Sequence, residues 1–185
     1  MAAHVKVVAG DAAAYMELVD RSNEATRLVK ANKLSEAETL LRDVLRRKPA
    51  AGFDAVSVAL TQHELGSVLR QRGRLDEALE LLAAALEVRD RADEAAGIGI
   101  ALRDGNLTRD EMGKVFEAMG DCERALQVRD PSRRICANDA CEALDYEKVQ
   151  ACGRCKCVFY CCKTCQKQDW KSRHHALCRP PKKAP

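Results

Sequence analysis

The end of the chain is crowded with side chains that bind metal. Ten cysteines occur in 185 residues, and nine of them fall between residues 136 and 178, together with the adjacent histidines His174 and His175. Because tetrahedral Zn²⁺ takes four Cys or His ligands, four closely spaced pairs are enough for two closed sites. The pairs are Cys136 with Cys141, Cys152 with Cys155, Cys161 with Cys165, and His174 with Cys178.

Two other interpretations of these cysteines are less favourable. A disulfide framework needs an oxidising compartment, and the first residues contain no apolar run typical of a signal peptide. A thioredoxin-type site needs a strand–helix setting, whereas Cys152 and Cys155 lie among further cysteines. Closed four-coordinate sites leave no position for a reactive water, so the two expected Zn²⁺ ions are structural and not catalytic.

The cysteine-rich segment has too few apolar residues to fold around a core of its own. Its aromatic residues are Tyr146, Phe159, Tyr160 and Trp170. Metal must therefore supply free energy of folding, on the order of 10–16 kcal/mol per structural zinc. The last two pairs each have a spacing of four residues, which predicts that both members lie on one face of a helix.

Residues 160–178 read YCCKTCQKQDWKSRHHALC, and with the cysteine pairs before them they resemble the MYND-type zinc finger. That family reads Tyr-Cys-x3-Cys-Gln, then Trp, then His-x3-Cys, and all of these residues are in place here. The family interleaves its two sites. The resemblance therefore implies one zinc on Cys136, Cys141, Cys161 and Cys165, and another on Cys152, Cys155, His174 and Cys178.

Some residues compete with this implied set. The first pair is spaced more widely than is common in the family. Cys157 and Cys162 are left over, and either could replace Cys161. His175 could replace His174, because it also lies within one helical turn of Cys178.

The resemblance also implies protein recognition. Fingers of this family bind short peptides with a Pro-x-Leu-x-Pro-like pattern, and Gln166 and Trp170 match the positions that contact such ligands. A preformed polyproline-type helix would dock on the aromatic surface with little loss of conformational entropy. The alternative is that Trp170 serves only to pack the finger's helix against its loops.

The residues before the finger are typical of helices, with 4% aromatic and 32% charged residues in the whole chain. Three segments, starting at Leu28, Leu69 and Phe116, share one pattern: a helix end, a polar turn, and a small residue on a new helix. Gly66 and Ala78 in the middle unit would let two helices approach closely. The small residues on the second helices are Ala37, Ala78 and Ala125.

This pattern resembles the tetratricopeptide repeat (TPR), and generic helical hairpins are the alternative. Such repeats stack helix pairs and line a groove with the first helix of each pair. The family's clamp for C-terminal carboxylates is absent from the corresponding positions, which disfavours binding of chaperone tails. The resemblance places these residues in the groove: Ser22, Thr26, His63, Ser67, Arg70, Asp110 and Lys114.

We therefore expect a mainly α chain in three parts. An antiparallel, TPR-like helical-repeat stack spans residues 1–132, and Pro131 is expected to stop its last helix. A small two-zinc, cross-braced finger spans residues 133–179, and a disordered basic tail spans residues 180–185.

The sequence predicts a zinc-binding adaptor that joins other proteins, and not an enzyme. An enzyme component, RING-like or associated with a methyltransferase, is one alternative, but no cofactor-binding signature occurs. A regulator that binds nucleic acid is another, but its basic residues do not lie on a base-reading helix. Without a signal peptide or a long apolar run, we expect an intracellular chain, cytoplasmic or nuclear, with no membrane partner.

Overall fold

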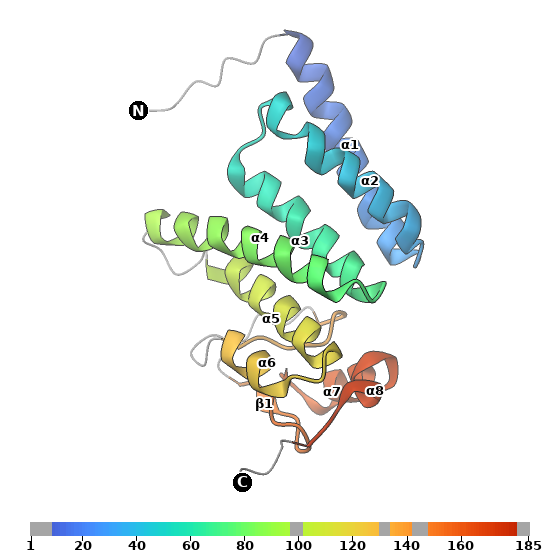
Figure 1. Ribbon diagram of the computed structural model, residues 1–185, viewed down its shortest axis with the longest axis vertical. Coiled ribbons are helices and arrows are strands. Elements are labelled where there is room, and N and C mark those ends of the chain that lie inside the picture. Colours follow the sequence, from blue (N-terminus) through green and yellow to red (C-terminus); the bar gives the residue numbers. More distant parts are fainter. Residues whose placement is uncertain (1–8, 97–101, 130–133, 142–147, 181–185) are drawn as a thin grey trace. The chain divides into compact units, whose positions relative to one another are not determined.

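The computed structural model describes residues 9–96, 102–129, 134–141 and 148–180 (Figure 1). Helices make up most of these residues, as expected. The chain divides into two compact units, residues 1–92 and 93–185, and each is described by itself. The expected boundary after residue 132 stays a prediction. It falls inside the second unit, next to a stretch that includes Pro131 and lies outside the described residues.

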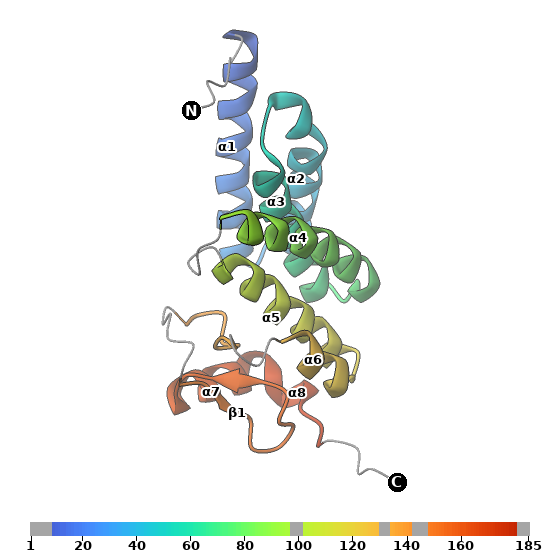
Figure 2. The same cartoon turned by 90° about the vertical axis from the view of Figure 1, so that its left-hand side faces the viewer.

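The first unit is a series of helices joined by short turns. It contains α1 (Ala9–Lys30), α2 (Leu34–Arg47), the 3-10 turn η1 (Pro49–Ala51), α3 (Ala55–Gln71) and the greater part of α4 (Leu75–Ala96). Helix α1 packs against α2, and α2 against α3, as Figure 2 shows. The buried face of α2 carries Ala37, Leu41 and Val44 at helical spacing, which explains its position in the stack.

Local signals in the sequence set the limits of α3. The side chain of Asp54 caps its first turn by accepting a hydrogen bond from the Ser57 amide at 2.7 Å. Gly73 follows the helix with a φ of 79°, a left-handed conformation that glycine adopts at low cost. These signals produce the predicted turn between the two helices of the middle unit.

The predicted close approach of α3 and α4 is confirmed. A Cβ atom added to Gly66 would lie 2.8 Å from the Leu82 Cγ and 3.3 Å from the Ala78 carbonyl oxygen. Leu65, Leu69 and Leu82 are fully buried in this unit. The small side chains therefore bring the helices together, and the leucines fill the space between them.

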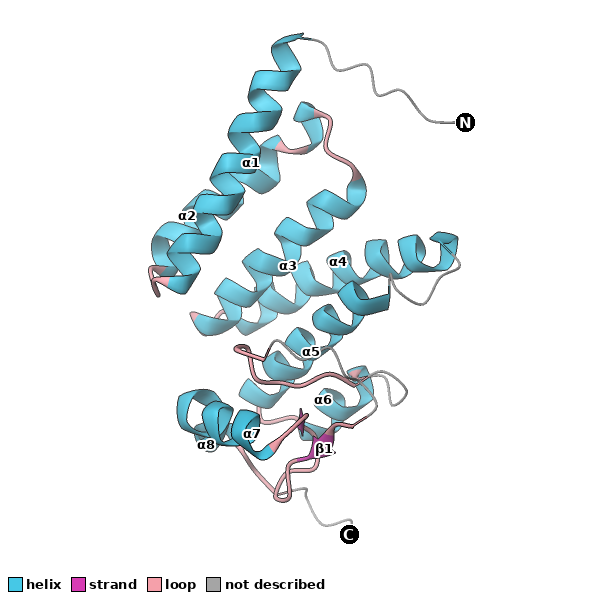
Figure 3. Cartoon of the chain, turned by 180° about the vertical axis from the view of Figure 1, so that it is seen from behind, coloured by secondary structure: helices cyan, strands magenta, loops and turns pink. Residues whose placement is uncertain are grey.

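The second unit joins a helical hairpin to the cysteine-rich segment. The hairpin consists of α5 (Leu102–Ala118) and α6 (Cys122–Val128). A two-stranded antiparallel sheet follows, in which β1 (Gln150–Ala151) pairs with β2 (Phe159–Tyr160), with Gln150 opposite Tyr160. The chain then forms α7 (Lys163–Asp169), the π-helical turn η2 (Trp170–His174) and α8 (His175–Leu177), seen from behind in Figure 3.

The hairpin and the cysteine-rich segment share one core. Ala125 from α6 belongs to the same buried cluster as Cys157, Val158 and Tyr160, and Phe116 from α5 packs against it. The cysteines thus take the place of aliphatic side chains at the centre of this unit. None of the helices described is long and apolar enough to cross a membrane.

Candidate metal centre

The first group of candidate ligands consists of four cysteines. The sulfurs of Cys136, Cys141, Cys161 and Cys165 all lie within 4.8 Å of one another. The Cys141 Sγ is 3.5 Å from the Cys161 Sγ, which is in turn 3.6 Å from the Cys165 Sγ. Tetrahedral zinc with Zn–S bonds of 2.3 Å would separate its sulfurs by about 3.8 Å. Four sulfurs at these separations suit a zinc ion.

The second group combines three cysteines with one histidine, and all four side chains are buried. The Nε2 atom of His174 lies 3.4 Å from the Cys152 Sγ and 3.5 Å from the Cys155 Sγ. The Cys152 Sγ is 3.9 Å from the Cys178 Sγ. Three sulfurs and one imidazole nitrogen form a donor set that zinc prefers.

Tight turns position the cysteines that come before α7. The Cys152 amide donates to the Val158 carbonyl at 2.7 Å, and the Lys156 amide donates to the Cys152 carbonyl at 3.0 Å. Lys156 has a φ of 63°, so the chain turns sharply between β1 and β2. The Ala137 amide donates to the Phe159 carbonyl at 2.9 Å, which holds the neighbouring Cys136 beside the sheet.

The expectation that the last two pairs each lie on one helix is wrong. Cys161 precedes α7, whose N-cap is Cys162, and Cys178 follows the end of α8. Only Cys165 lies within α7, and His174 ends the π-helical turn. A π-turn adds one residue to a helical turn and so changes the direction of the side chains that follow it.

The groups match the sets that the resemblance implies. The structure brings Cys136, Cys141, Cys161 and Cys165 together, and separately Cys152, Cys155, His174 and Cys178. Cys157, Cys162 and His175 belong to neither group among the described residues. Cys162 is exposed, and the ring of His175 packs against Trp170 with a centroid distance of 4.8 Å.

Electrostatics favour a cation in both groups. Burial, together with the neighbouring thiols, raises the pKa of Cys136 to about 11 and that of Cys178 to about 12. The pKa of Cys155 falls to about 3, first because of its hydrogen bond with Cys157 and also because of His174. Thiolates so close together repel one another. A divalent cation removes that repulsion and lets all of the cysteines in a group ionise.

A buried network of charges that the sequence analysis missed lies beside the second group and reaches it at His174. Arg129 donates to the Asp110 carboxylate at 2.8 Å, to the Glu117 carboxylate at 2.6 Å and to the Cys157 carbonyl at 2.7 Å. Arg173 donates to Glu117 at 2.7 Å. The side chains of Asp110, Glu117 and Arg129 are each at most 3% exposed. The network links α5, the end of α6 and the finger.

Two residues expected in a repeat groove belong to this network instead. Asp110 and Lys114 are buried, and the Lys114 Nζ lies 3.1 Å from the Asp110 carboxylate. The prediction that both line an open groove is therefore wrong. Their sequence positions on α5 are those of groove residues, but in this unit that helix buries its charges in ion pairs.

The groove residues expected in the first unit agree with the structure better than Asp110 and Lys114 do. Thr26, His63 and Ser67 line one cavity, with Thr26 on α1 and the other two on α3. Glu64 lines it as well, and burial raises the pKa of this carboxyl group above its usual value. The first helices of two successive pairs thus face a common hollow, as a repeat stack requires.

The predicted peptide-contact residues lie together on the surface of the finger. The amide of Trp170 donates to the carbonyl of Gln166, so the two residues are one helical turn apart. Both are half-buried. The ring of Trp170 meets the His174 ring edge-on at a centroid distance of 5.8 Å, so it has a packing role and also leaves part of its surface accessible.

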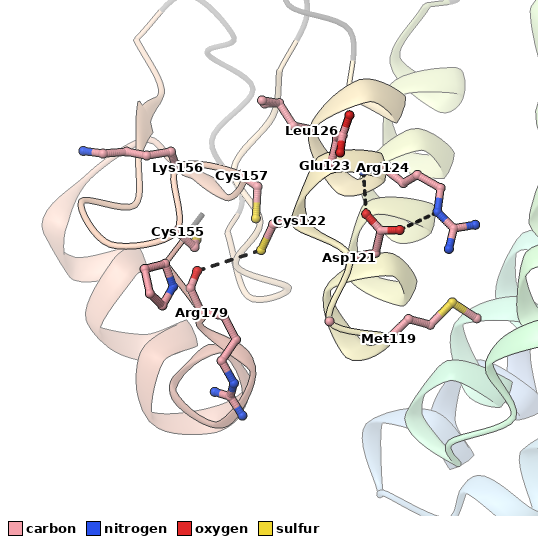
Figure 4. Close-up of a pocket in the computed structure, with 12 residues that line it drawn as sticks. Met119, Asp121, Cys122, Glu123, Arg124, Leu126, Cys155, Lys156, Cys157 and Arg179 are labelled. Carbon is pink, nitrogen blue, oxygen red and sulfur yellow. Dashed lines mark hydrogen bonds and ion pairs between the residues drawn. The ribbon is translucent and has the colours of Figure 1, made fainter. Parts of the chain in front are cut away.

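A larger cavity lies elsewhere in the second unit (Figure 4). It has a volume of about 730 Å³ and neither Gln166 nor Trp170 lines it. The two unassigned thiols Cys122 and Cys157 both face it in Figure 4, and the Cys122 Sγ is 4.0 Å from the Arg179 carbonyl oxygen. This cavity borders the second metal group through Cys155.

Comparisons with known proteins agree with the predicted finger and with the middle one of the three predicted repeat units. Residues 136–178 match the model of the MYND finger family, and residues 58–92 match that of a tetratricopeptide repeat. A stretch of 33 residues is 52% identical to Egl nine homolog 1 from Mus musculus. That stretch is 18% of this chain and 8% of the mouse protein. No solved structure matches the chain. The chain thus contains a MYND zinc finger and a tetratricopeptide repeat, and its finger binds zinc.

Proposed function

We propose that this chain is a non-catalytic adaptor whose zinc finger and helical repeat each bind a protein partner. Both matched families are modules of protein interaction, and a chain that carries two such modules can hold two partners near each other. The finger, in this proposal, binds short proline-containing peptides through Gln166 and Trp170. The helical unit binds a second partner along the cavity lined by Thr26, His63 and Ser67.

The observation that carries the proposal is the closure of both metal groups. Each brings four donor atoms within 4.8 Å of one another, which satisfies a tetrahedral zinc ion without a water ligand. Zinc in such a site stabilises a fold and offers no position for a substrate. We assign the eight grouped side chains as the ligands, and the role that remains for the finger is to present a surface. The proposal includes a reducing compartment, since thiolate ligands must stay reduced.

The shape of the finger supports peptide binding at Gln166 and Trp170. Trp170 meets the buried ring of His174 and the exposed ring of His175, both edge-on, and these two contacts restrict the orientation of the indole. A rigid indole beside an amide side chain offers the combination that a polyproline-type ligand requires: an aromatic surface and a hydrogen-bonding group. A preordered surface also reduces the entropy lost on binding.

A peptide array with the zinc-loaded, full-length chain tests this proposal. We expect proline-containing peptides to bind, and Gln166→Ala and Trp170→Phe to weaken binding while both zinc ions are retained. Lys167→Ala is the matched control, because this residue lies on the same helix and is exposed. The peptide-binding proposal fails if no proline-containing peptide binds, or if the control weakens binding as much as the two test variants.

A further inference from the structure

A carboxylate from the helical hairpin reaches the second metal group. Glu117 lies near the end of α5, outside the segment that matches the finger family, and it is 2% exposed. Its Oε2 atom is 3.4 Å from the Nδ1 atom of His174. Its other oxygen, Oε1, accepts a hydrogen bond from Arg129. Burying a charged carboxylate costs free energy of folding, so the position of Glu117 beside His174 calls for an explanation.

The ring of His174 has two nitrogens with different surroundings. Nε2 faces the sulfurs of Cys152 and Cys155 at 3.4 and 3.5 Å, so it is the nitrogen that would bind a metal. Nδ1 lies on the opposite side of the ring and is buried. Within the described part of the chain, no hydrogen bond of good geometry reaches Nδ1, and Glu117 is the acceptor that lies next to it. A histidine that binds zinc through Nε2 carries its proton on Nδ1, and that proton needs an acceptor.

We propose that Glu117 is a positioning residue for zinc: its carboxylate accepts the Nδ1 proton of His174 and orients the ring toward the three cysteines. This inference rests on the assignment of His174 as a ligand. A carboxylate on the far nitrogen fixes the tautomer and the ring orientation, and it makes the imidazole a stronger electron donor to the metal. The site for the second zinc therefore includes a residue 19 positions before the matched finger begins at residue 136.

Two arginines hold Glu117 in place. Arg173 donates to Oε2 at 2.7 Å and Arg129 donates to Oε1 at 2.6 Å, so each carboxylate oxygen has a cationic partner. Arg129 also donates to the carbonyl of Cys157, two residues after the ligand Cys155. The helical hairpin and the finger thus meet beside the second group of ligands, and loss of this contact should lower the affinity of one zinc site and spare the other.

Cobalt titration of the full-length chain tests this inference. Co²⁺ bound by three cysteines and one histidine absorbs visible light differently from Co²⁺ bound by four cysteines, so the two sites are followed separately. In Glu117→Gln, we expect the affinity of the histidine-containing site to fall about 10- to 100-fold, which is the usual effect of losing such a partner. The site with four cysteines should change less than about threefold.

Asp110→Asn is the matched control for disruption of the network. Asp110 accepts from Arg129 in the same buried network and pairs with Lys114, and within the described part of the chain its hydrogen bonds and ion pairs do not involve His174. We expect this variant to change the cobalt affinity of both sites only slightly and to the same extent. The role of Glu117 would be overturned if Glu117→Gln lowered the cobalt affinity of both sites equally, or of neither. It would also be overturned if Asp110→Asn lowered the affinity of the histidine-containing site alone. If the wild type binds no second ion, the ligand assignment itself is wrong and this inference fails with it.

A measurement on the wild type covers the case in which a variant does not fold. In the zinc-loaded chain, nitrogen NMR of the imidazole rings should show that His174 carries its proton on Nδ1 and that this proton exchanges slowly with water. A proton on Nε2, or an Nδ1 proton that exchanges as fast as that of an exposed histidine, would contradict the proposed contact with Glu117.

Discussion

Gly113 on α5 leaves the space that the guanidinium group of Arg129 fills. A Cβ atom added to Gly113 would lie 2.7 Å from the Nε atom of Arg129 and 2.8 Å from its Nη1 atom. The guanidinium cannot move away freely, because it is 3% exposed and is bonded to Asp110, Glu117 and the Cys157 carbonyl. The absence of a side chain at one position of a helix therefore allows the buried network to form.

Gly113→Ala should destabilise the second unit. Alanine favours helix over glycine by up to about 1 kcal/mol, but the clash with Arg129 forces overpacking that costs about 1–3 kcal/mol. We expect a net loss of stability, seen as a lower midpoint of thermal unfolding of the zinc-loaded chain. Gly153→Ala is the control, because a Cβ atom at that position meets no atom within 4 Å. A Gly113→Ala protein more stable than the wild type would contradict the close packing.

Arg129→Met should have a larger effect. Its removal leaves the Asp110 and Glu117 carboxylates buried with fewer cationic partners, and breaking a buried ion pair in this way costs about 3–5 kcal/mol. The matched control is Arg124→Met. Arg124 also pairs with an acid, Asp121, but its side chain is 57% exposed, and such surface pairs contribute about 0–1 kcal/mol. Denaturant titration of both zinc-loaded variants measures the difference, and equal losses would show that the network has no special importance.

Cys161→Ala and Cys162→Ala should differ in zinc content, although the residues are adjacent. Cys161 belongs to the group of four cysteines, whereas Cys162 is exposed and caps α7. We expect Cys161→Ala to retain one tightly bound zinc and Cys162→Ala to retain two, by elemental analysis of purified protein. Loss of a zinc in the second variant only would mean that Cys162 replaces its neighbour as a ligand.

Glu64→Gln should change how the stability of the helical unit depends on pH. Burial raises the pKa of Glu64, although Lys48 and Arg89 oppose the rise. Between the unfolded value near 4.3 and this raised pKa, the folded state binds more protons than the unfolded state. Stability contributed by this group is therefore present below about pH 4.3 and is lost as the pH rises through the folded pKa.

The glutamine variant cannot ionise and so avoids this loss. It should be more stable than the wild type at pH 7, and the difference between the two proteins should shrink as the pH falls toward about 4. Thermal unfolding followed by circular dichroism measures that difference at each pH. Glu80→Gln, an exposed position on α4, is the control. A Glu64→Gln protein less stable than the wild type at pH 7 would mean that attraction to Lys48 outweighs burial.

Spacing alone predicted metal binding, but it did not predict how the pairs combine. Pairs such as Cys136 with Cys141 are visible in the sequence because chelation needs short loops. The way the pairs interleave was predicted only from the family resemblance. It depends on which pairs the β1–β2 hairpin brings together in space, and spacing does not show this. The helical-face prediction failed for Cys161 because Cys162 caps α7, so the helix begins at Lys163, two residues after Cys161.

The charge network was not predictable from the sequence pattern. Glu117 and Arg129 look like ordinary surface charges of helices in a chain that is 32% charged. Their burial depends on the contact between the hairpin and the finger, which no local spacing encodes. Gly113, a small residue beside charged helix positions, is the one signal in the sequence that another group lies close to α5.

The measurement that tests the account most directly is native mass spectrometry of freshly purified, reduced chain before and after treatment with a chelator. We expect a mass increment of two zinc ions and, once a chelator removes them, rapid hydrogen exchange throughout residues 148–180, because the metal replaces a hydrophobic core there. A chain that carries no zinc, or a finger whose amides stay protected after both ions have gone, would contradict the account.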